Sequence, residues 1–365
     1  MTALVEKLVP DSIKKLIPYQ SARRIARDMD KTENTIWLNA NELETCCQYG
    51  ERQDGANSHY HRYPDYLPTD LAVAYREYGA ATLGCQSEIM AVRGADEAID
   101  LLVRTFCQPG NDQILVCPPT YGMYEFCADS IGITTAVVPL TESFQLNLPE
   151  ITKQLPDTSI VFLCSPNNPT GNVLHQQDVV TLLEATKQQA LVVVDEAYIE
   201  FAPHTSVLHL MAQYPHLVVI RTLSKAFGLA AIRVGFLIAD SSVMSYVARL
   251  VAPYPIADPS AEIALKALSA SGVAQMKQQT TQLIAIRDEF IHAVSQLSIV
   301  DKIYPSSTNF VLIRFKGNDN FYQYLLDHGV VARSPAHEES VQGCVRISIG
   351  SAESMDTVLR VLQNY

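Results

Sequence analysis

The sequence predicts an α/β protein: a large domain with a mainly parallel central sheet, followed by a smaller α+β domain. Short uninterrupted runs of Val, Ile and Leu recur between residues 89 and 220, and such runs are typical of strands that helices cover on both faces. Each run leads into a polar turn and then into a helical pattern. After residue 251 prolines punctuate the chain and this alternation stops, which indicates a change of domain.

Length and composition limit the class of protein. A chain of 365 residues is too long for a single small hydrophobic core. Its content of 48% hydrophobic and 18% charged residues is typical of a soluble globular enzyme. A net charge of -12 argues against nucleic acid as a partner, because a phosphate backbone requires a basic face. No apolar run approaches the length of a membrane span, so we expect no membrane partner either.

The cysteines and histidines predict neither a disulfide framework nor a metal site. The eight cysteines are scattered without a Cys-x-x-Cys pair, which fits reduced thiols. His59 and His61 are close in sequence, but no third ligand accompanies them, and solvated loop histidines are the favoured interpretation. The first twenty residues contain no uninterrupted apolar segment, so we expect no secretory signal and a cytoplasmic location.

We expect three parts along the chain. Residues 1–45 form an N-terminal arm that contributes to the small domain, because short apolar patches alternate there with charges and prolines. Residues 46–252 form the large domain, and residues 253–365 form the small domain.

In the large domain, the predicted strand 89–93 precedes a helix that starts at Gly94 and carries its apolar residues on one face. The other predicted strands are 114–117, 160–164, 191–194 and 217–220. A polar cluster follows each of them. In open α/β sheets ligands bind beyond the carboxyl ends of the strands, so we expect these clusters to form one site.

In the small domain, a long helical pattern comes first, with Leu283, Ile286, Phe290, Ile291 and Val294 spaced for one face. It is followed by a predicted strand at residues 309–314, a helix that ends near Gly329, and a strand at residues 344–349.

The segment after the strand 217–220 carries the most informative lysine. Lys225 follows the hydroxyl residues Thr222 and Ser224, and Arg233 lies downstream. An amine placed there can form a Schiff base, while the hydroxyls and the arginine can hold a phosphate. This combination fits pyridoxal 5'-phosphate, which needs a covalent anchor and an anion clamp.

Asp195 directly follows the predicted strand 191–194 and is a second indication of this cofactor. An acidic residue at the end of an aliphatic strand is unfavourable unless a cation meets it. A protonated pyridine nitrogen is such a partner, although an ordinary carboxylate that caps a helix fits the same position. Tyr198, three residues on, can donate a hydrogen bond to a phenolate oxygen of the ring, or it can be a core residue.

Three weaker signals agree with this interpretation. The turn of residues 165–171 is fixed by prolines and a glycine and presents the side chain of Asn168, although a plain loop has the same composition. Ala95 and Asp96 lie at a helix start, where free backbone N–H groups favour a phosphate. Tyr121, after a Pro-Pro-Thr sequence, is placed to stack on a ring or to pack in the core.

Together these motifs resemble the fold-type I aminotransferases that use pyridoxal phosphate, in chain order across nearly the whole sequence. The resemblance implies that Lys225 binds the cofactor covalently and moves the proton, that Asp195 pairs with the ring nitrogen, and that Tyr198 and Asn168 contact the phenolate oxygen. It implies a stacking role for Tyr121 and a carboxylate-binding role for Arg346. The implied phosphate ligands are Ala95, Asp96, Thr222, Ser224 and Arg233.

Further motifs resemble the histidinol-phosphate aminotransferase family, including Arg62-Tyr63-Pro64 and the Asp-Glu-Ala-Tyr-Ile-Glu-Phe sequence at 195–201. This resemblance implies a homodimer in which Tyr63 reaches the cofactor phosphate of the neighbouring subunit. It also implies that Tyr19 and Asn41 line the substrate pocket and that Arg333 pairs with the substrate phosphate.

The implied reaction moves an amino group between L-histidinol phosphate and 2-oxoglutarate. An aromatic-amino-acid aminotransferase or a threonine-phosphate decarboxylase of similar fold is the alternative, and Tyr19, Asn41 and the Pro-Thr-Tyr-Gly-Met-Tyr sequence at 119–124 favour the first reaction. A regulator that binds the cofactor without turnover is a third interpretation. It is disfavoured because no basic helix-turn-helix segment precedes the arm.

Overall fold

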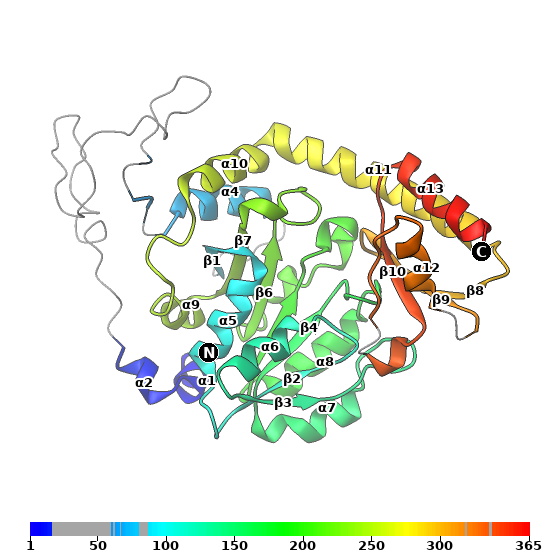
Figure 1. The fold of residues 1–365 in the computed structure, drawn as a ribbon. Helices are drawn as coiled ribbons and strands as arrows, with labels where there is room; N and C mark the ends of the chain where they lie inside the picture. Colours follow the sequence, from blue (N-terminus) through cyan, green and yellow to red (C-terminus); the bar gives the residue numbers. More distant parts are fainter. Residues whose placement is uncertain (17–59, 61–62, 66, 80–86, 318–319, 336–337) are drawn as a thin grey trace.

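The computed structural model describes residues 1–16, 60, 63–65, 67–79, 87–317, 320–335 and 338–365. A large sheet with helices on both faces lies beside a small sheet that carries its own helices (Figure 1). The predicted fold class, α/β with a mainly parallel sheet and a smaller α+β part, is confirmed.

The large sheet has seven strands in the order β1-β7-β6-β5-β4-β2-β3. Neighbouring strands from β3 through β2, β4 and β5 to β6 are parallel, whereas β7 runs antiparallel to both β1 and β6. The bounds are β1 Ser87–Val92, β2 Gln113–Val116, β3 Thr134–Val137, β4 Thr158–Cys164, β5 Leu191–Asp195, β6 Leu217–Thr222 and β7 Gly235–Asp240.

All five strands predicted in the large domain are present, but the sequence pattern does not predict β3 and β7. Strand β3 lies at the edge of the sheet and is partly exposed along its length, so it lacks an apolar run. Strand β7 starts at Gly235, where the segment that the sequence assigns to a site ends.

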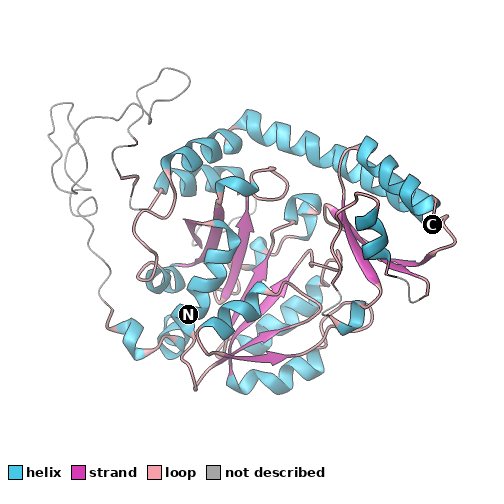
Figure 2. Cartoon of the chain, in the orientation of Figure 1, coloured by secondary structure: helices cyan, strands magenta, loops and turns pink. Residues whose placement is uncertain are grey.

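Helices cover both faces of this sheet (Figure 2), and successive residues of β4 therefore enter different cores. Ile160 and Phe162 pack with α5 and α6 on one face, while Val161 and Leu163 pack with α7 and α8 on the other. The helices of this part are α1 Thr2–Leu8, α2 Asp11–Lys14, α4 Thr69–Gly79, α5 Gly94–Phe106, α6 Met123–Ser130, α7 Leu148–Gln154, α8 Gln176–Thr186, α9 Ser241–Val247 and α10 Asp258–Leu268.

The small sheet is antiparallel, in the order β10-β9-β8. Its strands are β8 Val300–Ile303, β9 Phe310–Phe315 and β10 Cys344–Ser348, and its helices are α11 Ala270–Val294, α12 Phe321–Asp327 and α13 Ala352–Gln363. The C-terminal half of the long helix α11 packs on this sheet through Phe290 and Val294. The predicted long helix is confirmed, and β8 is an addition that the sequence pattern does not predict.

The predicted limits of arm and domains remain predictions. Helix α10 packs on α4, and its Ala264 and Leu268 belong to a core of the large sheet, whereas α11 continues to the small sheet (Figure 1). Helix α1 contacts α9 beside the large sheet. The arm from residue 17 onward lies outside the described residues.

Among the residues that the structure describes, no helix is both long enough and apolar enough to cross a membrane. Within the same residues, no group of three or more His, Cys, Asp or Glu side chains is arranged to hold a metal ion. The cysteines of this part of the chain, Cys107, Cys117, Cys127, Cys164 and Cys344, are buried free thiols.

Candidate active site

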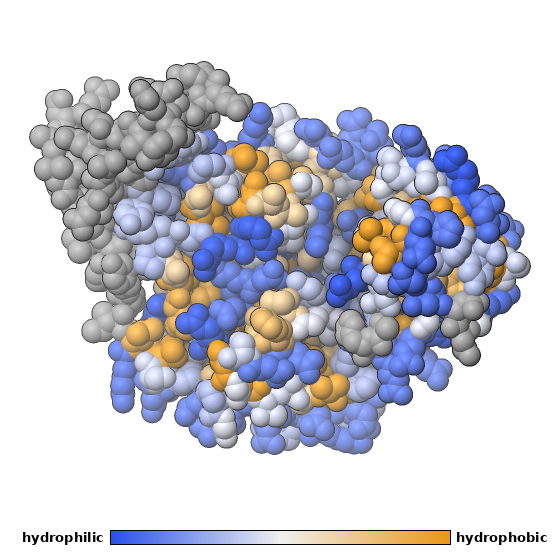
Figure 3. Space-filling view, in the orientation of Figure 1, coloured by the Kyte–Doolittle hydropathy of each residue, from blue (hydrophilic) through white to orange (hydrophobic). Residues whose placement is uncertain are grey.

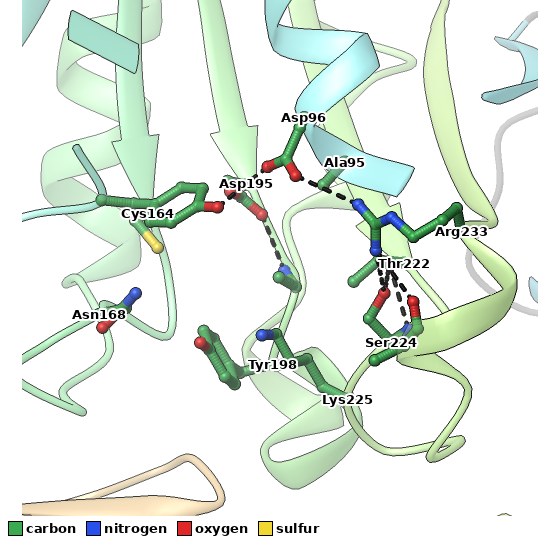
Figure 4. Close-up of a pocket in the computed structure, with 13 residues that line it drawn as sticks. Ala95, Asp96, Cys164, Asn168, Asp195, Tyr198, Thr222, Ser224, Lys225 and Arg233 are labelled. Carbon is green, nitrogen blue, oxygen red and sulfur yellow. Dashed lines mark hydrogen bonds and ion pairs between the residues drawn. The ribbon is translucent and has the colours of Figure 1, made fainter. Parts of the chain in front are cut away.

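A pocket opens at the carboxyl ends of β4, β5 and β6, against the N-terminus of α5 (Figure 4). The parallel strands bring together polar clusters that are far apart in the sequence. The lining residues that the sequence predicts for the site are Ala95, Asp96, Tyr121, Asn168, Asp195, Tyr198, Thr222, Ser224, Lys225 and Arg233. Cys164, Ala197 and Ala230 complete the lining.

One end of the pocket is suited to an anion. Helix α5 starts at Gly94 without a side-chain cap for its first N–H groups, and Glu97 instead accepts hydrogen bonds from the backbone N and Nε of Arg93, at 2.6 and 2.7 Å. Uncapped N–H groups at a helix start attract phosphate. Across the pocket, the Thr222 hydroxyl donates to Ser224 Oγ at 2.9 Å, and Arg233 Nη1 donates to the same oxygen at 3.4 Å.

Asp96 balances the charge at this end. Its carboxylate accepts hydrogen bonds from the Tyr121 hydroxyl at 3.0 Å and from Arg233 Nη2 at 3.2 Å. The side chains of Asp96 and Arg233 are 39% and 47% exposed, so solvent weakens their ion pair, and the guanidinium remains accessible from the pocket.

A glycine of the lysine segment allows this close arrangement. A Cβ atom added to Gly235 would lie 2.7 Å from the carbonyl carbon of Gly94 and 2.9 Å from the backbone nitrogen of Ala95. Glycine therefore lets β7 approach the first turn of α5 directly. The distance between the helix start and the Thr222 end of β6 is set in part by this contact, because Gly235 pairs with Thr222.

Asp195 is the last residue of β5 and is 2% exposed. Burial raises the pKa of its carboxyl to about 6, although hydrogen bonds from the Tyr124 hydroxyl, at 2.9 Å, and from the backbone N of Ala197, at 3.0 Å, act in the opposite direction. A cation at the carboxylate would stabilise its ionised form further.

Lys225 projects its amine into the pocket between two groups of side chains. Figure 4 shows Asn168 and Tyr198 on one side of the amine and Thr222, Ser224 and Arg233 on the other. The amine lies 5.5 Å from the centroid of the Tyr198 ring. Although the residue is exposed to the open pocket, surrounding protein atoms and then the charge of Arg346 lower its pKa. A lowered pKa favours the neutral, nucleophilic amine.

The small sheet contributes Arg346 to the same region. From β10, its Nη1 donates a hydrogen bond to Oδ1 of Asn168, and its guanidinium lies 5.2 Å from the centroid of the Phe310 ring. Its Nε is buried without a hydrogen-bond partner in the described part of the chain. Burial lowers its pKa. A buried guanidinium N–H without an acceptor is suited to a ligand anion.

Of the remaining predicted residues, Arg333 and Tyr63 do not line the pocket, and the other two lie outside the described residues. The backbone of Arg333 pairs with that of Arg346 through hydrogen bonds of 3.0 and 2.8 Å, but its exposed side chain does not line the pocket. Tyr63 is 49% exposed, stacks on Tyr254 with ring centroids 4.6 Å apart, and is not part of the pocket of its own chain. Tyr19 and Asn41 lie outside the described residues.

Besides Ala197 and Ala230, the sequence pattern does not assign Tyr124 and Cys164 to the site, where the structure places them. Tyr124 lies one helical turn after Tyr121 and bonds to Asp195, and Cys164 pairs with Asp195 across β4 and β5. Both signals were present in the sequence as helical spacing and as aligned strand ends. The contact of Cys164 with Asp195 follows from the register of β4 and β5, and the contact of Tyr124 follows from the packing of α6 on the sheet.

Comparisons with known proteins agree with this geometry. The family model described as aminotransferase class I and II matches residues 33–362. A histidinol-phosphate aminotransferase of Escherichia coli O81 (strain ED1a) is 41% identical over 362 residues, which is 99% of this chain and 98% of the relative. The protein of the same name from Shigella sonnei (strain Ss046) has the same identity and coverage.

Solved structures share the fold. The histidinol-phosphate aminotransferase of Clostridium acetobutylicum superimposes with a TM-score of 0.76 at 23% identity, covering 83% of this chain and 90% of that one. The L-threonine-O-3-phosphate decarboxylase of Porphyromonas gingivalis superimposes with a TM-score of 0.71 at 21% identity, covering 84% and 90%. At these identities the likeness concerns the fold alone.

Proposed function

The chain belongs to the class I and II aminotransferases, and within them to the histidinol-phosphate aminotransferase family, and from this premise we propose its reaction. It transfers an amino group reversibly between L-histidinol phosphate and 2-oxoglutarate, giving imidazole acetol phosphate and L-glutamate, in L-histidine biosynthesis. The observation that carries the proposal is 41% identity over 99% of the chain to relatives of that name. The pocket supports it, because the predicted cofactor ligands other than Tyr63 line it.

We propose pyridoxal 5'-phosphate as the cofactor, and the residues present fit it. Asp195 is a buried carboxylate whose hydrogen-bond donors in the described part of the chain, the Tyr124 hydroxyl and the backbone N of Ala197, are both neutral, so it suits a protonated ring nitrogen. The uncapped start of α5, with Thr222, Ser224 and Arg233, is suited to the phosphate. When bound, the cofactor supplies an aldehyde that exchanges amino groups and an electron-withdrawing ring.

The side chains around the amine have complementary roles in this proposal. Lys225 Nζ binds the cofactor, and its lowered pKa suits it to take up and release the proton of the amino-bearing carbon of the substrate. Tyr198 and Asn168 hold the phenolate oxygen, and Tyr121 stacks on the ring. With the cofactor bound, these residues would orient it so that Lys225 Nζ could reach the amino-bearing carbon of the substrate.

Arg346 and Arg333 serve the two substrates alternately. Histidinol phosphate presents a phosphate, and 2-oxoglutarate presents carboxylates, so the pocket needs cations that accept either anion, as a planar guanidinium does. The unpartnered Nε of Arg346 supports its part of the proposal. If Arg333→Ala left the kinetics for the phosphorylated substrate unchanged, its part would fail. Tyr19 and Asn41 complete the proposed substrate pocket.

We propose a homodimer in the cytoplasm, with active sites shared between subunits. Tyr63 is exposed, as are Val73 on α4 (56%) and Ile263 on α10 (45%), and Figure 3 shows apolar surface over the region of α4 and α10. In a shared site, Tyr63 of one subunit contacts the phosphate bound by the other. No nucleic acid or membrane takes part.

Mixing two inactive variants tests the shared site. Subunits with Lys225→Ala lack the reactive amine, and subunits with Tyr63→Ala lack the donated hydroxyl. A mixed dimer contains one site with both native residues, so activity should return after the two are unfolded and refolded together. Activity that stays at the level of the separate variants would show that Tyr63 acts within its own subunit, or not at all.

A half-reaction screen tests the substrate. The cofactor-loaded enzyme is mixed in turn with L-histidinol phosphate, phenylalanine, tyrosine and L-threonine phosphate, and the specificity constants are compared. We expect histidinol phosphate to exceed each alternative by at least about a hundredfold, as a charged group without its partner costs about 3 kcal/mol. A higher constant for an aromatic amino acid, or release of carbon dioxide from threonine phosphate, would replace the proposed reaction.

A further inference from the structure

Tyr124 contacts the buried carboxylate of the site from outside the predicted set of cofactor ligands. It lies in α6, is 0% exposed, and donates a hydrogen bond of 2.9 Å from its hydroxyl to Oδ2 of Asp195. Its ring is stacked on Phe162, with centroids 4.9 Å apart, and meets Tyr121 edge-on at 5.7 Å. The hydroxyl is therefore held in one place by aromatic packing on both sides.

The carboxylate is held at both of its oxygens. Tyr124 occupies Oδ2, and the backbone N of Ala197 donates to Oδ1 at 3.0 Å. Two donors on different oxygens fix the rotation of the carboxylate group, and they leave one lone pair of each oxygen for a ligand in the pocket. Most substitutions of Ala197 leave its backbone donor in place, whereas the donor of Tyr124 can be removed by substituting its side chain.

The titratable groups around Asp195 are Tyr124, Asp96, Lys225 and Cys164, together with Tyr121 and Tyr198, whose pKa values burial and the charge of Asp195 raise. Burial raises the pKa of Asp195 to about 6, the hydrogen bond from Tyr124 lowers it, and Asp96 on α5 raises it further while Lys225 lowers it. Cys164 on β4 faces the same carboxylate, and burial raises the pKa of its thiol. Burial and Asp195 also raise the pKa of Tyr124 well above its usual value, so it remains a neutral donor.

We propose that Tyr124 is a positioning residue of the cofactor site, whose hydroxyl keeps Asp195 ionised and oriented toward the ring nitrogen of the bound cofactor. This inference rests on the proposed cofactor. Removal of the hydroxyl leaves the carboxylate with one donor in a buried site. The carboxylate then takes up a proton more readily, and a protonated Asp195 does not stabilise a pyridinium.

The test compares Tyr124→Phe with the wild-type protein in binding of pyridoxal phosphate, without any substrate. The variant keeps both ring contacts and loses the hydroxyl alone. The dissociation constant for pyridoxal phosphate is measured from pH 5 to pH 8.5. The value of the variant is divided by that of the wild type at each pH, because the ionisation of the free cofactor cancels in this ratio. One hydrogen bond to a charged group corresponds to about one pKa unit.

We expect the variant to bind about fivefold more weakly near pH 6 and about tenfold more weakly near pH 5, with the ratio of dissociation constants falling toward one near pH 8.5, where Asp195 is ionised in both proteins. Tyr214→Phe is the matched control, because its hydroxyl donates to Glu184 at 2.6 Å, outside the pocket. A ratio that is constant across the pH range would overturn the proposal. Failure of the wild-type protein to bind the cofactor would instead overturn the proposed function.

A double-mutant cycle keeps the proposal testable if the variant folds poorly. Midpoints of urea unfolding are measured for the cofactor-free wild type, Tyr124→Phe, Asp195→Asn and the double variant. The hydroxyl should matter less in the Asp195→Asn background, where no buried carboxylate needs a donor. Equal effects of Tyr124→Phe in both backgrounds would show that the tyrosine only packs, and the proposal would be wrong.

Discussion

Arg346 of the small sheet donates a hydrogen bond to the side-chain oxygen of Asn168, a residue 178 positions earlier in the turn that follows β4. The contact joins the two sheets at the pocket. It also connects a proposed substrate ligand to a proposed cofactor ligand. A substrate anion that engages Arg346 therefore acts on a side chain that contacts the cofactor in the proposed arrangement.

Arg346 can be tested through the glutamate half-reaction. Loss of its guanidinium in Arg346→Ala should lower kcat/KM for L-glutamate about a hundredfold, the equivalent of about 3 kcal/mol for a charge-assisted hydrogen bond. Arg346→Lys should recover only part of the loss, since an ammonium cannot pair in the same bidentate way. Rapid-mixing absorbance measures the half-reaction. Arg360→Ala, on the exposed face of α13, is the control, and an equal effect there would refute a specific role.

Lys225 should carry both the colour and the turnover of the enzyme. The wild-type protein loaded with pyridoxal phosphate should be yellow, and Lys225→Ala should lose the absorbance of the lysine-bound cofactor. Its turnover should fall by at least about a thousandfold, because covalent binding and proton transfer depend on one amine. Spectra and rates are compared with Lys277→Ala, an exposed lysine of α11. A yellow, active Lys225→Ala protein would contradict the assignment.

Local sequence patterns were sufficient to predict most of the pocket, for a physical reason. Lys225, Asp195 and Asn168 each follow an apolar strand, and the carboxyl ends of parallel strands share one edge of a sheet. Each motif could therefore be read from a few neighbouring residues. The order of the strands was not needed to place them on a common side.

Contacts between distant elements could not be read in this way. The hydrogen bond between Tyr124 and Asp195 spans 71 positions and depends on how α6 lies on the sheet. The position of β7 between β1 and β6, antiparallel to both, also cannot be predicted from a local pattern. An apolar run does not specify which strands will be its neighbours in a sheet. The position of Arg346 over the pocket depends on the packing of the small sheet beside the large one.

Gly235 should be required for phosphate binding although it offers no side chain. In Gly235→Ala, the new Cβ would meet Gly94 and Ala95 at less than the normal contact distance and displace the start of α5. The dissociation constant for pyridoxal phosphate should rise about tenfold or more, since the first-turn N–H groups shift away from the phosphate. Gly122→Ala is the matched control, because an added Cβ has nothing within 4 Å there. Equal affinities of the two variants would contradict the prediction.

Asp195 should destabilise the cofactor-free protein at neutral pH. Its folded-state pKa of about 6 exceeds the ordinary value of 3.8, so the buried ionised form is unfavourable above pH 6, and the penalty disappears below about pH 3.8. Asp195→Asn should therefore raise the free energy of unfolding by about 2 to 3 kcal/mol at pH 8, with a gain that shrinks as the pH falls from 6 to 4. Urea unfolding of the cofactor-free proteins measures this gain, and Asp157→Asn, at an exposed position, should show none. Because the same substitution removes the proposed partner of the ring nitrogen, it should also weaken cofactor binding. If Asp195→Asn were less stable than the wild-type protein at pH 8, the neighbouring residues would already stabilise the ionised carboxylate, and the prediction would be wrong.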